Sequence, residues 1–448
     1  MTAKHIAILA YGTRGDIEPM IALGLALRNA GFRVRLAVPR AFEQLVLKEG
    51  IAAAPIRAGM DRMLASRRLW KYYRFGLLSR WLYIHDIQKS IGAKALEDMW
   101  SACRGCDAIV FHPMLPFATD IAEAMAVPCI MAAFQPLTPT RRFPLFSVAA
   151  GGAGGALNLL SYKMATVPYV YFTPRINAAR RRLLGLGKRG LFADPLTVRG
   201  DRPPAVYGIS KAVVSQPDDW PASALISGYW SSKPGLDTEA PSELDGFLAA
   251  SRKPVYIGFG SNPIASANDL LTLLTGALKA ADLRAVVCLS AAQLQSVSIA
   301  VDHARMFLSG PLPHHWLFER VAAAVHHGGA GTVAASLRAG LPTLVCPLLI
   351  DQLWWAGRVH ALGAGPSPIR YDKLTVSNLT ASLRDLTSNP RYAANAATIA
   401  EIISTENGAA RAADFIAQIA NGGVSRVAMN SRLLGGGPPG HAETDAVG

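Results

Sequence analysis

The chain of 448 residues is poor in cysteine and has no long uninterrupted apolar run. Five cysteines are few and odd in number, which argues against the disulfide framework of a secreted protein. The longest uncharged run, residues 143–162, is broken by glycines, a proline and polar residues, so it is a poor transmembrane segment. The N-terminus passes directly into an apolar run without a signal peptide. These features predict a cytoplasmic protein.

Acidic residues are scarce relative to basic ones, with 31 Asp and Glu against 45 Lys and Arg and a net charge of +14. Such a balance favours an anionic partner: a nucleotide diphosphate, an acidic membrane surface or nucleic acid. No zinc-finger, RNA-binding or helix-turn-helix signature accompanies the charge, so nucleic acid is the least favoured of the three. The length predicts two domains of about 200 residues, and the apolar content of 51% is ample for their cores.

The most informative stretch, residues 322–365, begins as a strand, a glycine turn and a helix. A short apolar run at 322–325 is followed by two histidines and a glycine-rich turn, after which a helical pattern starts at Thr332. Glycines let a ligand approach the backbone, and the free amides at a helix start favour an anion, here a diphosphate. The alternative is that the glycines merely close a tight turn.

The same stretch continues with a second strand and a second helix. An apolar run at 342–347 ends near Asp351 and Gln352, which begin a helical pattern closed by Gly363. Strand, turn, helix, strand, loop and helix make half of a doubly wound sheet, which builds a ligand crevice at its strand ends. Asp351 can instead serve only as a helix cap.

The start of the chain carries a comparable βαβ pattern. Residues 5–11 predict a buried parallel strand, 17–30 a helix and 34–38 the next strand. The connecting GTRGD loop lacks the spacing of a dinucleotide fingerprint, so NAD binding is not supported. Asp16 is placed either to accept a proton from a substrate or only to cap the helix, with Pro19 in the first turn.

The two patterns together resemble one enzyme family. HHGGAGT (326–332) with the following Asp-Gln pair and AGRVHALGAG (356–365), and GTRGDIEP (12–19), are similar to inverting GT-B nucleotide-sugar glycosyltransferases. The resemblance is to the antibiotic and sterol branch of the UDP-glycosyltransferase superfamily, and it covers about residues 4–420. It implies an α/β fold of two Rossmann-like domains that face each other across a cleft. The implied parts are an acceptor domain (1–215), a linker (216–245), a donor domain whose last helix crosses back (246–420) and a disordered tail (421–448).

The resemblance also implies a role for each matching residue. Asp16 is the general base, which takes the proton of the acceptor hydroxyl as the hydroxyl attacks the anomeric carbon. The implied donor-binding residues are Arg14, Ser261, Trp316, His327, Gly329, Gly331, Thr332, Asp351 and Gln352. Among these, His327 and the 329–332 turn hold the diphosphate, whereas Asp351 and Gln352 bond the sugar. His315 stands where the family more usually has an acid, and the resemblance therefore assigns it no donor contact.

Neither a metal nor another cofactor is expected. No Asp-x-Asp sequence occurs in the chain, so a metal-bridged diphosphate is not indicated. Helix amides and His327 would then supply the counter-charge for the diphosphate. Cys103 and Cys106 have CxxC spacing, but no second cysteine pair accompanies them, and we interpret the spacing as incidental.

The implied function is transfer of a hexose or deoxyhexose, with inversion, from a UDP- or TDP-sugar to a hydroxyl of a lipophilic molecule such as a natural product, sterol or lipid. Two alternatives stay open: a membrane-associated glycolipid or sterol glycosyltransferase, and a non-catalytic auxiliary partner, against which Asp16, Asp351 and Gln352 together argue. Bases and aromatics interleave at 67–83. That stretch is an acceptor wall, a patch that touches an anionic membrane from its cytoplasmic side, or a partly buried helix pair.

Overall fold

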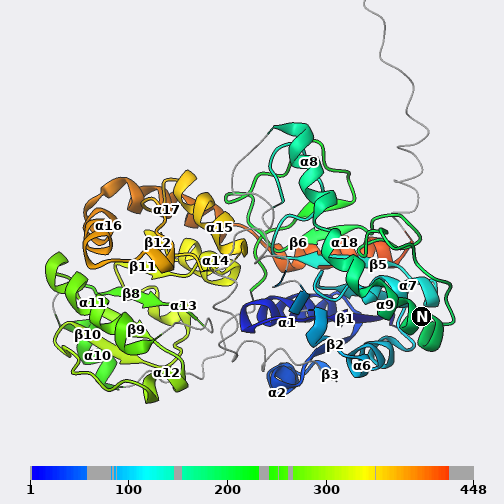
Figure 1. Cartoon of the computed structure of the whole chain (residues 1–448), viewed down its shortest axis with the longest axis horizontal. Helices are drawn as coiled ribbons and strands as arrows, with labels where there is room; N and C mark the ends of the chain where they lie inside the picture. Colours follow the sequence, from blue (N-terminus) through cyan, green and yellow to red (C-terminus); the bar gives the residue numbers. More distant parts are fainter. Residues whose placement is uncertain are drawn as a thin grey trace, which may run out of the picture.

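In the computed structural model of this protein, the described residues are 3–57, 82, 85–86, 88–145, 154–231, 242–250, 252–260, 266–348 and 350–422. They form two α/β bodies, each built on a parallel sheet (Figure 1). The predicted class, two doubly wound α/β domains, is confirmed. The aromatic and basic stretch at 67–83 lies outside the described residues except for residue 82, as do Ser261 and residues 423–448.

Every strand pair in both sheets is parallel. The first sheet contains β1 (His5–Leu9), β2 (Arg33–Pro39), β3 (Ala52–Ile56), β4 (Ala108–Phe111), β5 (Cys129–Ala133), β6 (Ala205–Tyr207) and β7 (Ala224–Ile226). The second contains β8 (Val255–Gly258), β9 (Ala285–Cys288), β10 (Met306–Ser309), β11 (Ala323–His326) and β12 (Thr343–Val345). The spatial orders are β3-β2-β1-β4-β5-β6-β7 and β10-β9-β8-β11-β12. β1 and β11 are therefore inner strands, and the loops that follow them start between neighbouring strands rather than at the outer strand of either sheet.

Helices cover both faces of each sheet. Those of the first body are α1 (Arg14–Asn29), η1 (Arg40–Phe42), α2 (Glu43–Lys48), α6 (Ala93–Cys103), α7 (Phe117–Met125), α8 (Gly155–Met164), η3 (Val167–Phe172) and α9 (Thr173–Leu184). Those that follow are α10 (Ser242–Ala249), α11 (Ala267–Ala281), α12 (Ala291–Gln295), α13 (His314–Leu317), α14 (Ala330–Arg338), α15 (Ile350–Ala361), η4 (Tyr371–Lys373), α16 (Val376–Ser388), α17 (Pro390–Ser404) and α18 (Gly408–Ala420). None of the described helices is both long and apolar enough to cross a membrane.

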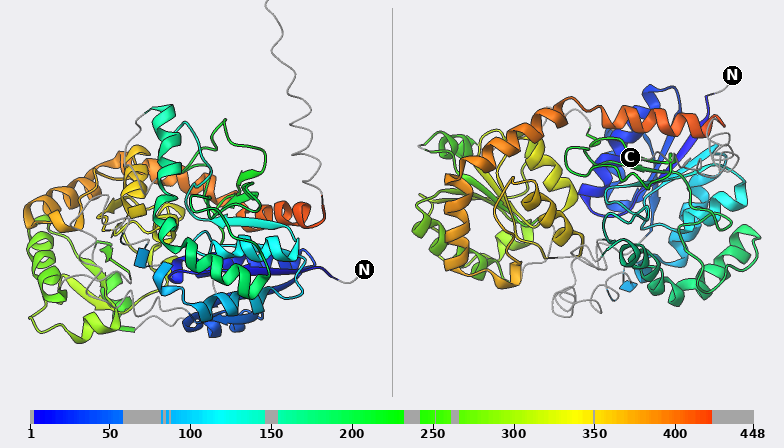
Figure 2. Two further views of the ribbon diagram at one scale, coloured as in Figure 1. Left: turned by 45° about the vertical axis from the view of Figure 1, so that its right-hand side comes forward. Right: turned by 90° about the horizontal axis from the view of Figure 1, so that it is seen from above.

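The last helix joins the two bodies. α18 follows α17 in sequence but packs against α1, and its Ile416 enters the same apolar cluster as Ile17 and Met20 (Figure 2). Further polar contacts link chain segments of the two bodies. Oε1 of Glu406 accepts hydrogen bonds from the Ser210 hydroxyl at 2.9 Å and a backbone amide of the first body at 3.0 Å.

One predicted boundary differs from the structure. The predicted linker, 216–245, contains β7, which pairs with β6, so the first body extends past residue 215. Elsewhere, residues 376–420 form three helices, α16, α17 and α18, because Pro390 starts a new helix and Gly408 another. The helix α9 ends at Leu184, because Gly185 adopts a left-handed conformation with φ 65°.

Candidate active site

The two sequence motifs meet where the bodies face each other. α1 starts just after β1, and α14 starts just after β11. Their first turns are in contact, since a Cβ added at Gly331 would lie 3.5 Å from the Cα atom of Gly15. The structure thus joins the first loop and the glycine turn into one site.

Asp16 lies at the third position of α1 and bonds back to the residue before the helix. The backbone amide of Thr13 donates to Oδ2 of Asp16 at 2.7 Å, and the Thr13 hydroxyl donates to the same oxygen at 3.1 Å. This capping box starts the helix at Arg14, so the predicted start at residue 17 is wrong by three residues and Pro19 lies inside the helix. Among the described residues nothing donates a hydrogen bond to Oδ1, which leaves that oxygen for a substrate.

The bent-back carboxylate of Asp16 depends on a glycine. Gly12 has φ +140°, and a Cβ there would lie 2.2 Å from Oδ2 of Asp16. Any side chain at position 12 would therefore collide with the carboxylate or push it out of the capping box.

The environment of Asp16 favours proton uptake. Burial raises the pKa of Asp16 to about 6, the two hydrogen bonds from Thr13 oppose this shift, and the negative charge of Asp351 adds to it. The side chain nevertheless keeps 24% of its surface exposed. A carboxylate of this pKa is ionised at neutral pH, yet accepts a proton more readily than an ordinary aspartate, as a general base requires.

His112 is a site residue that the sequence analysis missed. It follows β4, and its Nε2 lies 4.0 Å from Oδ1 of Asp16, with only 2% of the residue exposed. Within the described residues neither ring nitrogen has a hydrogen-bond partner, and burial lowers the pKa of His112 to about 3. The ring stacks on Phe134, with centroids 5.8 Å apart. A polar residue directly after the apolar run AIVF was the signal available in the sequence.

The two neighbouring histidines of the glycine turn have different surroundings. His326 is fully buried; its Nδ1 accepts from the amide of Gly328 at 3.0 Å, and its Nε2 lies 3.3 Å from the Ser336 hydroxyl. That hydroxyl donates to the Val333 carbonyl, so Nε2 of His326 carries the proton and His326 fixes the turn. His327 instead reaches toward Gly258 of β8, and its Nδ1 has no hydrogen-bond partner in the part of the chain that the structure describes.

Burial lowers the pKa of His327 to about 4, with a smaller opposing effect from a Gly258 backbone contact. The ring is therefore neutral at pH 7 and can offer a hydrogen bond, whereas the sequence analysis expected a positive charge. A Cβ at Gly329 would lie 2.5 Å from Nε2 of His327. Only glycine lets the backbone of the turn pass this close to the ring.

The start of α14 carries three of the predicted donor residues. Gly329 is the N-cap and Gly331 and Thr332 lie in the first turn, so the helix begins two residues before the predicted start at Thr332. The first intrahelical bond in this turn runs from the Val333 amide to the Gly329 carbonyl at 2.9 Å. The preceding amides have no partner within the helix, which makes this end suited to an anion.

Asp351 and Gln352 open α15, the helix after β12. Nε2 of Gln135, in the first body, donates to Oδ2 of Asp351 at 3.3 Å, and this contact crosses between the bodies. Burial raises the pKa of Asp351, and the bond from Gln135 opposes the shift. Oε1 of Gln352 accepts from the amide of Leu348 at 2.8 Å, so this buried side chain also holds the loop before α15. The sequence analysis missed Gln135.

The other predicted donor residues lie around this centre. Trp316 is half-buried on α13, and the guanidinium of Arg320 lies over its ring, 4.6 Å from the centroid. Arg14 is exposed and pairs with Glu18 at 2.5 Å, and its charge lowers the pKa of His314 on α13. Arg14 of the first body is therefore close enough to α13 of the second to act on it electrostatically. Ser261 lies outside the described residues, so its predicted role stays a prediction.

The described part of the chain contains no group of three or more His, Cys, Asp or Glu side chains that could bind a metal ion. Independence from metals stays a prediction. The five cysteines, including Cys103 and Cys106, are free thiols.

Two family models match the chain, one in each body. The Glycosyltransferase family 28 N-terminal domain matches residues 6–144, and the Erythromycin biosynthesis protein CIII-like C-terminal domain matches residues 272–416. These ranges contain the Asp16 loop and the 326–352 site. The chain belongs to the UDP-glycosyltransferase superfamily.

Curated relatives of this chain include fungal sterol 3-beta-glucosyltransferases. That of Debaryomyces hansenii is 33% identical over 93% of this chain, and that of Leptosphaeria maculans is 31% identical over 90%. The chain spans only 27% and 28% of the length of these two proteins.

Solved structures show the GT-B fold of this superfamily member at lower identity. The kitacinnamycin glycosyltransferase superposes with a TM-score of 0.66 at 17% identity, and it covers 94% of this chain and 100% of its own. The glycosyltransferase VinC, solved in complex with DTDP, gives 0.65 at 19% identity with the same coverage of both chains. At these identities the likeness extends to the fold alone.

Proposed function

We propose that this protein transfers a glycosyl group, with inversion, from a nucleoside diphosphate sugar to a hydroxyl of a lipophilic acceptor. One observation carries the proposal. A carboxylate with an unbonded oxygen and a raised pKa, Asp16, lies beside the anion-suited start of α14, with Asp351 close enough to act on its charge. A base and a diphosphate site are the two parts that such a transfer needs at one place.

The transfer itself is a single displacement. The acceptor oxygen forms a bond to the anomeric carbon as the bond from that carbon to the diphosphate oxygen breaks on the opposite face. The acceptor proton passes to Oδ1 of Asp16, and the bonding electrons leave with the diphosphate. Asp16 can serve in this step without leaving the capping box, because its hydrogen bonds from Thr13 occupy only Oδ2.

The diphosphate is assigned to the start of α14. The free amides of Ala330, Gly331 and Thr332 would hold its oxygens, and the neutral ring of His327 would donate its single N–H to the diphosphate in place of the Gly258 backbone contact. Asp351 and Gln352 would bond the sugar hydroxyls, and Trp316 and Arg14 would lie along the nucleoside end. We propose that these groups meet the leaving charge without a metal ion.

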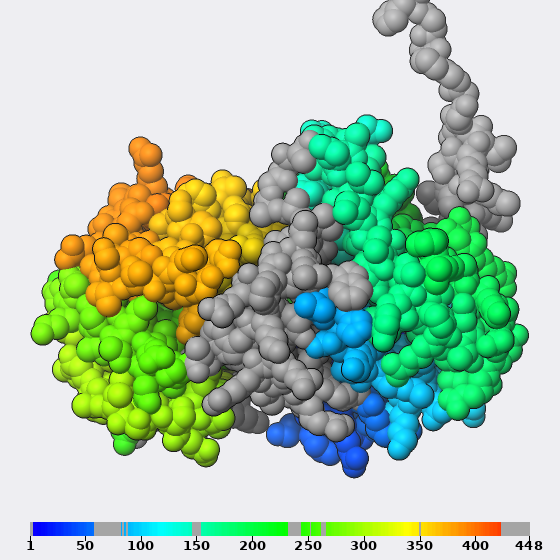
Figure 3. All heavy atoms as spheres, viewed as in Figure 1, coloured from blue at the N-terminus to red at the C-terminus, as the bar shows by residue number. Residues whose placement is uncertain are grey.

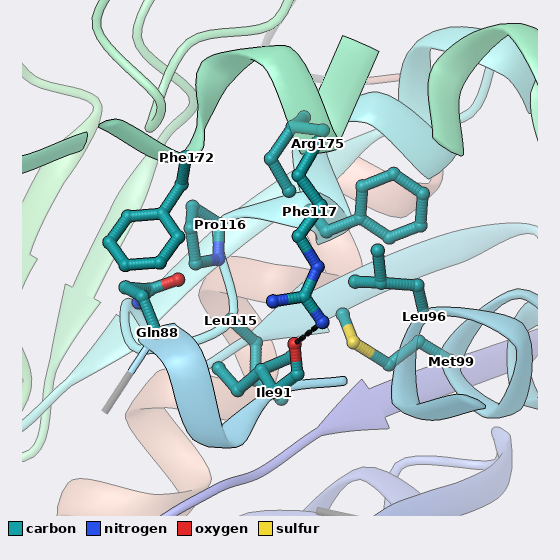
Figure 4. A pocket seen from close by; sticks show the side chains of 10 residues that line it. Gln88, Ile91, Leu96, Met99, Leu115, Pro116, Phe117, Phe172 and Arg175 are labelled. Carbon is teal, nitrogen blue, oxygen red and sulfur yellow. Dashed lines mark hydrogen bonds between the residues drawn. The ribbon is translucent and has the colours of Figure 1, made fainter. Parts of the chain in front are cut away.

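A small apolar pocket in the first body is where we place the apolar part of the acceptor that lies next to the base. Apolar side chains from α6, the loop before α7 and the start of α9 form most of its wall (Figure 4). Leu115 in this wall bonds through its amide to the carbonyl of His112, the neighbour of Asp16. A hydrophobic body in the cavity would therefore lie near the base, which suits a sterol or a lipophilic natural product.

The names of the relatives are consistent with this acceptor class. Sterol 3-beta-glucosyltransferases act on sterols by the activity in their name, and we extend only the class of apolar acceptor to this chain. We further propose a uridine or thymidine diphosphate sugar as donor, the latter in keeping with the DTDP complex of VinC. A cytoplasmic site of action stays a prediction.

Calorimetry and a transfer assay test the proposal together. Purified protein is titrated with UDP and with TDP, and then incubated with UDP- and TDP-glucose and a panel of sterols and macrolide aglycones. We expect micromolar or tighter binding of one nucleotide and a β-glycoside product, identified by NMR, from the α-linked donor. Binding without turnover on any acceptor would favour the auxiliary-partner alternative, and an α-linked product would contradict inversion.

A further inference from the structure

The helix α8 buries polar side chains and exposes apolar ones, the reverse of an ordinary surface helix. Its inward face carries two polar side chains beside the ring of Tyr162: Asn158 donates to the Arg141 carbonyl at 2.8 Å, and the Ser161 hydroxyl accepts from the Leu145 amide at 2.8 Å. Both of these side chains are buried. The outward face instead carries Leu157, Leu160 and Met164, with exposed fractions of 57%, 47% and 51%. Exposing these apolar side chains to water does not stabilise the fold of the chain itself.

The apolar face continues past the end of α8. Val167 and Tyr171 on η3 are 54% and 65% exposed, and we call these two residues, with the three on α8, the α8–η3 ridge. Of the ten exposed large hydrophobic residues in the described part of the chain, seven fall between positions 157 and 192. The other three, Leu47, Val376 and Ile402, are scattered over other helices. Isolated apolar residues on a surface are ordinary, but a contiguous row marks an interaction site.

The ridge stands out from the molecule. α8 projects above the first sheet in Figure 1, and Figure 3 shows the surface of the following residues continuing from α8 down the same face. Leu191 and Phe192 extend the row, since the Leu191 carbonyl accepts from the hydroxyl of Thr173, two residues after Tyr171.

The chain around the ridge is basic. Residues 154–200 contain eight lysines and arginines and a single acid, Asp194, which is itself paired with Arg202. Lys163, Arg181 and Lys188 are exposed and form no ion pair with the described residues. Exposed bases beside an apolar ridge match a bilayer with anionic headgroups, where apolar side chains enter the acyl boundary and bases remain at the headgroups.

We propose that the α8–η3 ridge is a docking surface for an anionic lipid bilayer. The ridge also leads to the acceptor cavity: Tyr171 packs edge-to-face on Phe172 at 5.1 Å, and Phe172 lines the cavity. A docked enzyme would therefore hold its cavity next to the lipid phase in which a lipophilic acceptor dissolves. This last consequence rests on the proposed transfer, whereas docking itself does not.

A second copy of the chain is a poorer occupant of the ridge. Symmetric dimers bring the same patch of each subunit together. Two copies of this surface would place Lys163 and its neighbouring bases against one another with one acid in the segment to offset them. A membrane surface of opposite charge has no such penalty.

Vesicle flotation of the full chain tests the docking. Vesicles of phosphatidylcholine are compared with vesicles that contain about a quarter phosphatidylglycerol, at low salt and at about 0.5 M salt. We expect flotation with the anionic vesicles at low salt and at least a tenfold weaker partition at high salt. In the triple variant Leu157→Gln, Leu160→Gln, Met164→Gln the partition should fall at least tenfold.

A matched control distinguishes the ridge from exposed apolar area in general. The triple variant Leu47→Gln, Val376→Gln, Ile402→Gln removes side chains that are 46%, 43% and 46% exposed, and it should float like the wild type. Melting temperature and nucleotide affinity should be unchanged in both variants, which shows that they are folded and bind nucleotide. Flotation then reports docking alone, whether or not the proposed transfer takes place. Wild-type protein that does not float, or a ridge variant that floats normally, would overturn the proposal. A dimer without lipid that the ridge variant dissociates would assign the ridge to a second copy instead.

Discussion

Nε2 of His112 lies 4.0 Å from Oδ1 of Asp16, and the two residues follow neighbouring strands of one sheet. The histidine is neutral, and neither of its ring nitrogens has a hydrogen-bond partner among the described residues. A small closure of this gap would let an N–H group donate to the carboxylate that we propose as the base. His112 would then position Asp16 and tune its pKa without reaching the substrate.

His112→Phe tests this coupling. Phenylalanine can keep the stack on Phe134 but removes the nitrogen beside Asp16. Because a hydrogen bond to the ionised form lowers a carboxyl pKa, its loss should raise the pKa of Asp16. We expect the acid limb of kcat/KM, near pH 6 in the wild type, to move up by roughly one unit. His303→Phe, at an exposed position, is the control and should leave the limb in place. An unmoved limb in His112→Phe would mean that His112 only fills space.

Removing the charge of Asp351 should lower the pKa of Asp16, whereas removing His112 should raise it. Asp351→Asn removes a negative charge that raises the pKa of Asp16, so the acid limb should move to lower pH.

Asp351→Ala and Gln352→Ala should both reduce turnover while UDP or TDP affinity stays within a few-fold of the wild type. Gln352→Ala should also lower the free energy of unfolding by about 1–2 kcal/mol, because the buried Leu348 amide loses its acceptor. A loss of nucleotide affinity as large as that of His327→Ala would contradict the assignment to the sugar.

The adjacent histidines should separate stability from binding. His326→Ala removes the partners of Gly328 and Ser336 in a fully buried place, so the free energy of unfolding should fall by about 2–4 kcal/mol. His327→Ala should leave the melting temperature within a few degrees and weaken nucleotide binding at least tenfold. Each variant serves as the control for the other, and calorimetry with UDP or TDP beside urea unfolding measures both effects. The reverse pattern would exchange the two roles.

Much of the fold follows from local sequence, and the rest depends on contacts that sequence order does not give. Strands such as 5–9 and 323–326 are apolar runs next to glycine turns, and both were predicted within two residues. β3 was missed because AAAPI is weakly apolar, and β6 and β7 because each has only three residues.

The same division applies to the site. Asp16, His327 and Asp351 belong to motifs that can be recognised in the sequence, and the structure brings these motifs together. His112 and Gln135 reach the site only because β4 lies beside β1 and β5 lies beside β4, a strand order that the sequence alone does not give. The helix start at Arg14 was missed because the cap is a reciprocal bond between Thr13 and Asp16, whereas the sequence analysis treated Asp16 itself as the cap.

The raised pKa of Asp16 has a consequence for stability. The folded carboxyl binds its proton more tightly than the unfolded one, so ionising it costs folding free energy above pH 6, and this cost is absent below pH 3.8. Asp16→Asn carries no such cost, so its stability relative to the wild type should rise between about pH 4 and pH 7, by on the order of 2 kcal/mol. Urea unfolding across this range measures the difference. A difference that is constant or that falls with pH would show that Asp16 is not destabilised as an anion.

The central claim, that Asp16 is the general base, is tested most directly by the transfer rate of Asp16→Asn at saturating donor. The amide oxygen can still accept from the Thr13 backbone, so the helix start and the melting temperature should be kept. Asp269→Asn, at the same third position of α11, is the matched control and should retain its rate. We predict that Asp16→Asn loses about two to four powers of ten in turnover with unchanged nucleotide affinity, because an amide cannot take up the acceptor proton. A variant that melts normally and retains more than about a third of the wild-type rate would remove Asp16 from the mechanism.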